Sequence, residues 1–377
     1  MQNTYLIFSF FGLPKSPILY IIADSHYVME EEAEFSLEVE YLTKDIQGIG
    51  GIIKSEPEHF SVEEIPAYEP CGSGEHVYIS ITREGMTSTE IVEKLGSLFK
   101  LQHKDIGFAG LKDKHAKTTQ TFSILIHDED LNKLANSVEE NLKVKVNWFK
   151  RHKNKLKPGH LKGNKFRILV LHPNPERVIK QAEIIKKVLL VKGVPNYFGV
   201  QRFGLRGHNP EEGKAILFGN RKYNKWLNKF LISAYQSQLF NFWLSERVSN
   251  GLFEKVLDGD VAIKEDSHGA FLVENQDAEQ KRFDMKEISF TGPIFGYRMK
   301  KPKGISGEAE QRIFDSEGLD LDILKKAGLK GSRRSGRLLI DEISISKVNN
   351  GLMFEFTLPK AAYATSVLRE FMKTGGL

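Results

Sequence analysis

Residues 107–124 of the 377-residue chain read GFAGLKDKHAKTTQTFSI, a polar segment between two apolar ones. The apolar residues at 106–109 and 121–126 are typical of two strands, so the residues between them are expected to form a loop. Asp113 lies in that loop with Lys112 and Lys114 on either side. Because nearby cations favour the ionised form of a carboxyl group, the pattern predicts a charged Asp113 on a loop held by rigid strands.

An ionised carboxylate on a loop suits a nucleophile or a base better than a proton donor. A solvated polar turn is the other interpretation of the KDK segment, because exposed charges in turns usually contribute little. The rest of the sequence is needed to choose between a reactive carboxylate and a solvated turn.

The composition is that of an ordinary folded protein, long enough for two or three domains. Hydrophobic residues make up 40% of the chain, charged residues 27%, and the net charge is only +5. Cys71 is the single cysteine, so no internal disulfide can form, and no Cys/His cluster has zinc spacing. These features favour a protein of the reducing cytoplasm.

The first 28 residues contain two apolar stretches, at 5–13 and 18–23, separated by Pro-Lys-Ser-Pro. Neither stretch reaches the ~20 apolar residues needed to span a bilayer. No basic region precedes them and no small-residue cleavage site follows, so we expect neither a membrane span nor a signal peptide. Residues 1–40 are treated as an N-terminal extension with no functional assignment.

Local signals predict several further elements. Thr87 and Glu90 have the spacing of a capping box, which marks the start of a helix, and Gly193 marks the end of another. The expected elements are strand and turn over 51–81, a helix from about residue 87 to residue 98, a helix over 176–192, a strand over 352–358 and a helix over 363–372.

Two basic tracts suggest contact with a polyanion. Residues 143–167 carry ten Lys or Arg and no acid, interleaved with aromatic residues, and residues 325–337 carry six cations and no acid. A basic run is often only a solvated face, but cations among aromatic residues are typical of nucleic-acid binding. The residues predicted to contact RNA are Lys150, Arg151, Lys153, Lys155, Lys162, Arg333 and Arg334.

Several common chemistries have no motif in this chain. The sequence contains no GxxxxGK[ST] phosphate loop, no GxGxxG after a strand, no HExxH and no GxSxG. An enzyme with this sequence is therefore expected to use a carboxylate, cations and aromatic residues, with no metal and no cofactor.

Five separated blocks resemble the TruD family of tRNA pseudouridine synthases, in the family's order and over residues 41–370. They are GIIKSEPEHFSVEE with GSGEH, FAGLKDKHAKTTQ, RHKNKLKPGHLKGNKF, KGVPNYFGVQRFG and LPKAAYATSVLRE. The resemblance implies that the chain isomerises uridine 13 of tRNA to pseudouridine, with no cofactor. It implies tRNA as the partner and no obligate protein partner.

The resemblance also implies an α/β (α+β) fold in which a second domain is inserted into the first. The pseudouridine synthase catalytic domain, with a mixed, largely antiparallel sheet, would comprise residues 41–192 and 340–377. The inserted TruD-specific α/β domain would comprise residues 193–339, and the two would form a cleft. Breaks in composition near Gly193 and Leu339 agree with these boundaries.

The matching positions imply roles for four residues. Asp113 matches the family's catalytic aspartate, which either attacks the nucleotide covalently or takes a proton from the sugar. Lys54 matches the lysine beside it, Phe166 matches the aromatic residue that stacks on the target base, and Asn164 would help to shape the pocket. Without the match, Lys54 would be a surface lysine, Phe166 a core residue and Asn164 a turn residue, so these three assignments depend on the resemblance.

Three alternatives stay open. One is the same isomerisation at another RNA site. Another is an RNA-binding protein whose carboxylate is incidental, although such a protein would have no need of Asp113 together with Lys54, Asn164 and Phe166. The third is a base-removing glycosylase, which would release free uracil.

Overall fold

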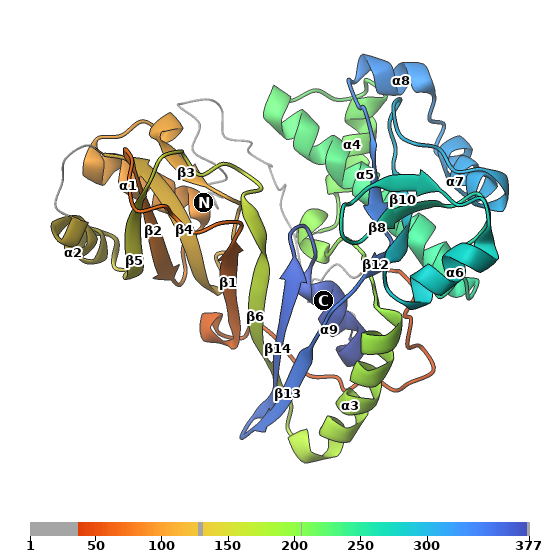
Figure 1. Ribbon diagram of the computed structural model, residues 1–377, viewed down its shortest axis with the longest axis horizontal. Helices are drawn as coiled ribbons and strands as arrows, with labels where there is room; N and C mark the ends of the chain where they lie inside the picture. Colours follow the sequence, from red (N-terminus) through yellow and green to blue (C-terminus); the bar gives the residue numbers. More distant parts are fainter. Residues whose placement is uncertain (1–36, 127–130, 205, 375–377) are drawn as a thin grey trace, which may run out of the picture. The chain divides into compact units, whose positions relative to one another are not determined.

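The computed structural model describes residues 37–126, 131–204 and 206–374, so the predictions for residues 1–28 lie outside the described residues. The described chain divides into two compact units. The first unit comprises residues 52–170, and the second comprises residues 37–51 and 171–374. Each unit has its own strands and its own apolar core (Figure 1).

The first unit is built on a mixed sheet with the strand order β6-β1-β4-β2-β5, and β3 pairs with β4. Strands β1 and β4 run parallel, whereas the other pairs within this unit run antiparallel. This arrangement confirms the predicted mixed, largely antiparallel sheet. The strands are β1 (Phe60–Pro66), β2 (His76–Arg83), β3 (Ile106–Phe108), β4 (Lys117–Leu125), β5 (Lys145–His152) and β6 (Leu161–Leu171).

Helices α1 (Ser88–Phe99) and α2 (Leu131–Leu142) cover one face of this sheet (Figure 1). Helix α1 begins at the predicted capping box, because the Thr87 side chain accepts from the Glu90 amide and the Glu90 carboxylate accepts from the Thr87 amide. Two 3₁₀ turns complete the unit, η1 (Pro57–His59) and η2 (His103–Asp105).

Strand register determines which side chains share the helix-covered face. Phe122 of β4 lies in the core under α1 and α2, and Thr118 of the same strand pairs with Val62 of β1. Because alternate residues of a strand share a face, Glu64 of β1 lies on this same face. Asn164 pairs with Glu64, and β6 therefore places Asn164 and Phe166 on this face too.

The second unit combines helices with a four-stranded antiparallel sheet in the order β11-β10-β8-β9. β12 pairs with β7, and β13 pairs with β14 as a hairpin. The strands are β7 (Val194–Pro195), β8 (Val261–Lys264), β9 (Ala270–Leu272), β10 (Ile288–Ile294), β11 (Ser332–Ser335), β12 (Arg337–Leu338), β13 (Ile343–Val348) and β14 (Gly351–Pro359).

Helix α5 carries much of the core of this unit, because its Phe240, Trp243 and Leu244 pack against Phe290 of β10. In the described part of the chain, no helix combines the length and the apolar character needed to cross a membrane. The helices are α3 (Pro175–Lys192), α4 (Asn209–Leu217), α5 (Lys225–Ser249), α6 (Gln276–Asp284), α7 (Gly304–Ser316), α8 (Leu321–Lys326) and α9 (Ala364–Met372), with the 3₁₀ turn η3 (Val200–Arg202).

Helix α3 ends where the sequence predicts. Gly193 follows its last residue with a φ of +81°, in the left-handed region that favours glycine. A Cβ at this position would lie 2.6 Å from Cγ of Arg337, so the close approach of that side chain also requires glycine.

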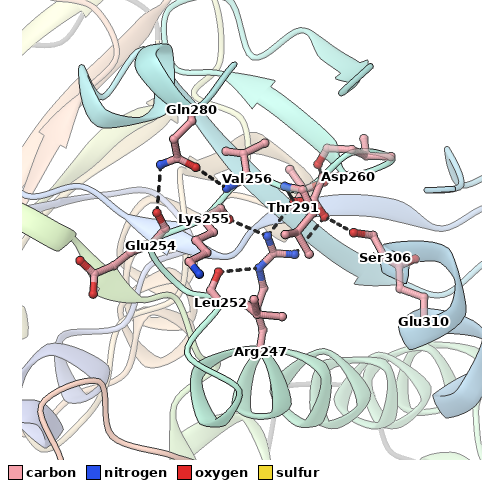
Figure 2. Close-up of polar contacts among 12 residues, drawn as sticks. Arg247, Leu252, Glu254, Lys255, Val256, Asp260, Gln280, Thr291, Ser306 and Glu310 are labelled. Carbon is pink, nitrogen blue, oxygen red and sulfur yellow. Dashed lines mark hydrogen bonds and ion pairs between the residues drawn. The ribbon is translucent and has the colours of Figure 1, made fainter. Parts of the chain in front are cut away.

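A buried ion pair connects α5 to the start of β8 (Figure 2). Arg247 donates to both carboxylate oxygens of Asp260, at 2.9 and 2.6 Å, and their side chains are 6% and 2% exposed. Asp260 also accepts from the Ser306 hydroxyl at 2.7 Å and the Leu257 amide at 2.9 Å. The Arg247 guanidinium lies 4.0 Å from the ring centroid of Phe290. The carboxylate thus has several hydrogen bonds besides its ion pair, as a buried charge requires.

The predicted insertion of residues 193–339 remains a prediction. Residues 171–192 and 340–374, which were expected to belong to the catalytic domain, lie in one compact unit with residues 193–339. A compact unit can contain parts of two domains, so its boundaries alone do not establish an insertion.

Candidate active site

Asp113 lies on the loop between β3 and β4, as the sequence predicts. Its Oδ2 accepts a hydrogen bond from Nζ of Lys54 at 2.9 Å, and its Oδ1 accepts from the backbone N–H of His115 at 3.1 Å. The Asp113 side chain is nevertheless 44% exposed. The carboxylate is therefore held at both oxygens and can still be reached from solvent.

The environment keeps Asp113 ionised. Partial burial by itself raises the pKa of this carboxyl group, but the Lys54 ammonium and the His115 N–H more than offset it. The net result is a pKa below the ordinary value of 3.8. An ionised carboxylate can attack an electrophilic carbon or accept a proton, so this geometry suits the two roles that the sequence left open.

Lys54 has an unusual backbone conformation that directs it to Asp113. Its φ is +59°, in the left-handed region, which costs a non-glycine residue roughly 1–2 kcal/mol. Such conformations occur at active sites and also at helix ends, as at Lys100 and Lys373 of this chain. The Lys54 ammonium also lies 4.7 Å from the ring centroid of Phe60.

Phe60 connects two of the predicted site residues. Its ring lies edge to face with that of Phe166, with the centroids 6.2 Å apart, and it also contacts Lys54. Phe166 is only 7% exposed, so in this structure its ring is buried within the first unit. The sequence did not single out Phe60, although its place at the start of β1, in alternation with Val62 and Glu64, could have indicated it.

A buried hydrogen-bond network anchors the loop ahead of Asp113. The Lys112 amide donates to the Ser88 hydroxyl at 2.9 Å, and the Gln120 side chain donates to the Gly110 carbonyl at 2.5 Å. Ser88 and Arg83 both donate to Gln120 Oε1, at 2.8 and 2.9 Å. Burial lowers the pKa of Arg83 to about 10, which still leaves it charged at neutral pH. The loop is thus tied to the start of α1 and to β4.

Lys112 brings Asn164 to the same loop. Its Nζ donates to Oδ1 of Asn164 at 2.6 Å and lies 3.3 Å from Oε2 of Glu64. From the sequence, Lys112 is only a cation beside Asp113, and Glu64 carries no signal of its own for the site. The position of an acid on the inward face of β1 is a sequence signal that Glu64 needs a buried partner, but it does not identify Lys112 as that partner.

The residues predicted to bind RNA separate into different environments. In the first basic tract, Lys150, Lys153 and Lys162 are exposed. Arg151 and Lys155 are partly buried and donate to backbone carbonyl groups of the same unit. Three of these five side chains therefore have the exposure that a phosphate contact needs.

Arg333 and Arg334 are held inside the second unit. Arg333 pairs with Glu310 at 2.7 Å, and the two side chains are 5% and 6% exposed. Arg334 donates to Oδ1 of Asn196 at 2.7 Å and lies 4.1 Å from the ring centroid of Phe198. Both guanidinium groups have partners within the second unit, so the RNA-binding surface proposed below omits them, and a contact of either one with RNA stays a prediction.

Removing the Lys54 charge is expected to change the pH dependence of the reaction. In Lys54→Met, burial still raises the pKa of Asp113 while the largest opposing interaction is lost, so this pKa moves upward. The acid limb of the kcat/KM profile should then move to higher pH. A profile measured between about pH 4.5 and 8 checks this. Lys54→Arg, which keeps the charge, is the matched control, and an unmoved acid limb in Lys54→Met would contradict the pairing.

The mixed α/β fold thus presents a cation-paired aspartate on a loop between two of its strands. The family model for tRNA pseudouridine synthase D (TruD) matches residues 36–223 and 221–371. The chain therefore belongs to the TruD family of tRNA pseudouridine synthases, which confirms the family indicated by the five sequence blocks.

Individual relatives agree with this assignment. A tRNA pseudouridine synthase D from Thermus thermophilus is 43% identical over 339 residues, covering 89% of this chain and 93% of the relative. One from an Anaeromyxobacter species is 36% identical over 344 residues, covering 89% and 96%. A crystal structure from Methanosarcina mazei, assigned to tRNA pseudouridine synthase D, superposes with a TM-score of 0.71 at 25% identity, covering 89% of this chain and 96% of that one.

Proposed function

We propose that this protein acts in the cytoplasm and isomerises uridine 13 of tRNA to pseudouridine, with Asp113 as the reacting carboxylate. The observation that supports this most directly is the ionised, accessible Asp113, held by Lys54 at 2.9 Å and by the His115 amide at 3.1 Å. Membership of a family of tRNA pseudouridine synthases supplies the reaction and the class of substrate.

The reaction rearranges one nucleotide and consumes nothing. The bond between N1 of uracil and C1′ of ribose breaks, the base turns, and C5 becomes joined to the same C1′. A proton leaves C5 and N1 gains one, so the product is an isomer of the substrate. Asp113 would either form a bond to the nucleotide or take a proton from the sugar, and an ionised carboxylate fits both.

The target base must leave its stack before it can react, at a cost of a few kcal/mol. Contacts to the tRNA backbone can offset this cost, and the exposed Lys150, Lys153 and Lys162 are the proposed contacts. Trp148 is 36% exposed and shares a face of β5 with Lys150, which places an aromatic ring beside a cation.

Alanine substitution of Lys150, Lys153 or Lys162 is expected to weaken tRNA binding, because each removes one phosphate contact. Each variant should lower the salt slope of log Kd by about 1. Equilibrium binding measured between about 50 and 300 mM salt checks this. Lys281→Ala, which removes an exposed lysine of α6, is the control and should leave the slope unchanged. Unchanged slopes in all three variants would contradict the proposed surface.

Tritium release tests the proposed reaction. A tRNA labelled with tritium at C5 of its uridines loses the label to water when C5 becomes bonded to ribose. Release of tritium without free uracil supports the proposal. Free uracil would indicate a glycosylase, and tight tRNA binding without release would indicate a non-catalytic RNA-binding protein, so either result would overturn it.

A further inference from the structure

Lys112, the residue before Asp113, is buried in the first unit. Its Nζ lies 3.3 Å from Oε2 of Glu64 and 2.6 Å from Oδ1 of Asn164. The side chains of Lys112 and Glu64 are only 7% and 2% exposed. Glu64 and Asn164 are opposite each other in the register of β1 and β6, so one ammonium group meets both acceptors. A lysine in this position is not available to an RNA phosphate.

The pair formed by Lys112 and Glu64 is costly to maintain. Burial lowers the pKa of Lys112 and raises that of Glu64, and their mutual attraction offsets only part of each shift. Within the described residues, Oε2 of Glu64 has no hydrogen bond of good geometry to complement the charge contact. Apolar side chains of similar volume would fill such a site at least as favourably. Stability alone therefore does not account for the pair.

The contact with Asn164 suggests what the pair does. An ammonium group only donates hydrogen bonds, so the Asn164 atom that faces Lys112 must be the amide oxygen. The amide nitrogen, Nδ2, is then directed away from Lys112, and it has no hydrogen-bond partner in the part of the chain that the structure describes. Asn164 is partly exposed, so this donor can be offered to a ligand.

We propose that Lys112, held by Glu64, is a positioning residue that fixes the Asn164 amide so that Nδ2 donates to a carbonyl oxygen of the bound uracil. This inference rests on the proposed function. Uracil carries carbonyl oxygens at C2 and C4, whereas cytosine carries an amino group at C4 that cannot accept. A donor fixed toward O4 therefore selects uracil over cytosine, and one fixed toward O2 would only orient the base.

A double-mutant cycle tests this proposal. One change removes the Asn164 amide, and the other replaces a carbonyl oxygen of the target base by sulfur. The substrates are tRNAs with uridine, 2-thiouridine or 4-thiouridine at the target position, because a thiocarbonyl accepts hydrogen bonds more weakly. For the unmutated protein, kcat/KM should be about tenfold lower with one of the two thio substrates than with the uridine substrate. We call this ratio the thio penalty, and that substrate the sensitive thio substrate. With the uridine substrate, kcat/KM of Asn164→Ala should be about tenfold lower than that of the unmutated protein. For this variant, kcat/KM with the sensitive thio substrate should be little lower than with uridine, so its thio penalty should be small.

Variants of the pair itself show whether Lys112 acts through Asn164. Lys112→Met leaves Glu64 buried without a partner, so the double variant Lys112→Met with Glu64→Gln is used to retain the fold. In that double variant the amide can rotate, and the penalty for the sensitive thio substrate should shrink toward the value seen in Asn164→Ala. Glu64→Gln alone removes the anion, but the new amide oxygen can still accept from Lys112, so the contact between Lys112 and Asn164 and most of the thio penalty should be retained.

The outcomes separate this inference from the proposed function. A thio penalty that shrinks in both Asn164→Ala and the double variant supports the positioning role. Equal losses on all three substrates, with the thio penalty unchanged, would show that Lys112 and Asn164 only support the fold and would overturn the inference alone. No pseudouridine from the unmutated protein on the uridine substrate would overturn the proposed function and this inference with it.

Discussion

Replacing Asp113 by asparagine is expected to lower the rate of pseudouridine formation by about 10³-fold or more, because the amide can neither attack carbon nor accept a proton effectively. Asparagine keeps the size of the side chain and can still accept the hydrogen bond from the His115 amide. The loop should therefore retain its conformation, and tRNA affinity should change little. Single-turnover assays with saturating protein separate the loss of chemistry from any loss of binding.

Asp105→Asn is the matched control for this substitution. Asp105 belongs to the same unit, and its carboxylate accepts from the Gln102 amide at 3.2 Å, a contact that asparagine can also make. We expect its rate to stay within about twofold of the unmutated protein. If Asp113→Asn retained a similar rate, the carboxylate would not take part in the reaction.

Arg247→Met is expected to lower the free energy of unfolding by about 3–5 kcal/mol, the largest stability effect that we predict for a single substitution. The reason is that Asp260, whose side chain is 2% exposed, would keep a buried charge without its cation. The remaining hydrogen bonds from Ser306 and Leu257 compensate only part of this cost. Urea denaturation followed by circular dichroism measures the change.

Two further variants make this stability prediction specific. Arg312 forms an ion pair with Glu246 at 2.5 Å, but their side chains are 61% and 38% exposed, so Arg312→Met should cost less than about 1 kcal/mol. Adding Asp260→Leu to Arg247→Met removes the unpaired charge and should recover part of the lost stability. Similar losses in Arg247→Met and Arg312→Met would show that burial of the remaining carboxylate does not determine the cost of removing its cation.

Local sequence signals predicted elements well where one residue determines the conformation. The capping box of Thr87 and Glu90 gives the start of α1, and Gly193 gives the end of α3. The parallel pairing of β1 with β4 could not be predicted in this way, because β2, α1 and β3 lie between them in the chain. Such long-range pairing depends on packing that no local pattern encodes.

The candidate site shows the same division between local and long-range information. The sequence placed Asp113 on a loop between strands, because apolar segments flank it on both sides. It could not show that Lys54 adopts a left-handed conformation, or that Lys112 is buried against Glu64. Nor could it show that Arg333 pairs with Glu310, which is 23 positions earlier and lies on another element. A charged residue can be assigned to a surface only when its partners are known.

Carbodiimide-based mapping of pseudouridine tests the central claim most directly. Unmodified tRNA that carries uridine 13 is incubated either with the unmutated protein or with Asp113→Asn, and reverse transcription then reports the modified position. We predict a stop at position 13 that only the unmutated protein produces. A stop of equal strength from Asp113→Asn, or no stop from either protein despite salt-sensitive tRNA binding, would contradict it.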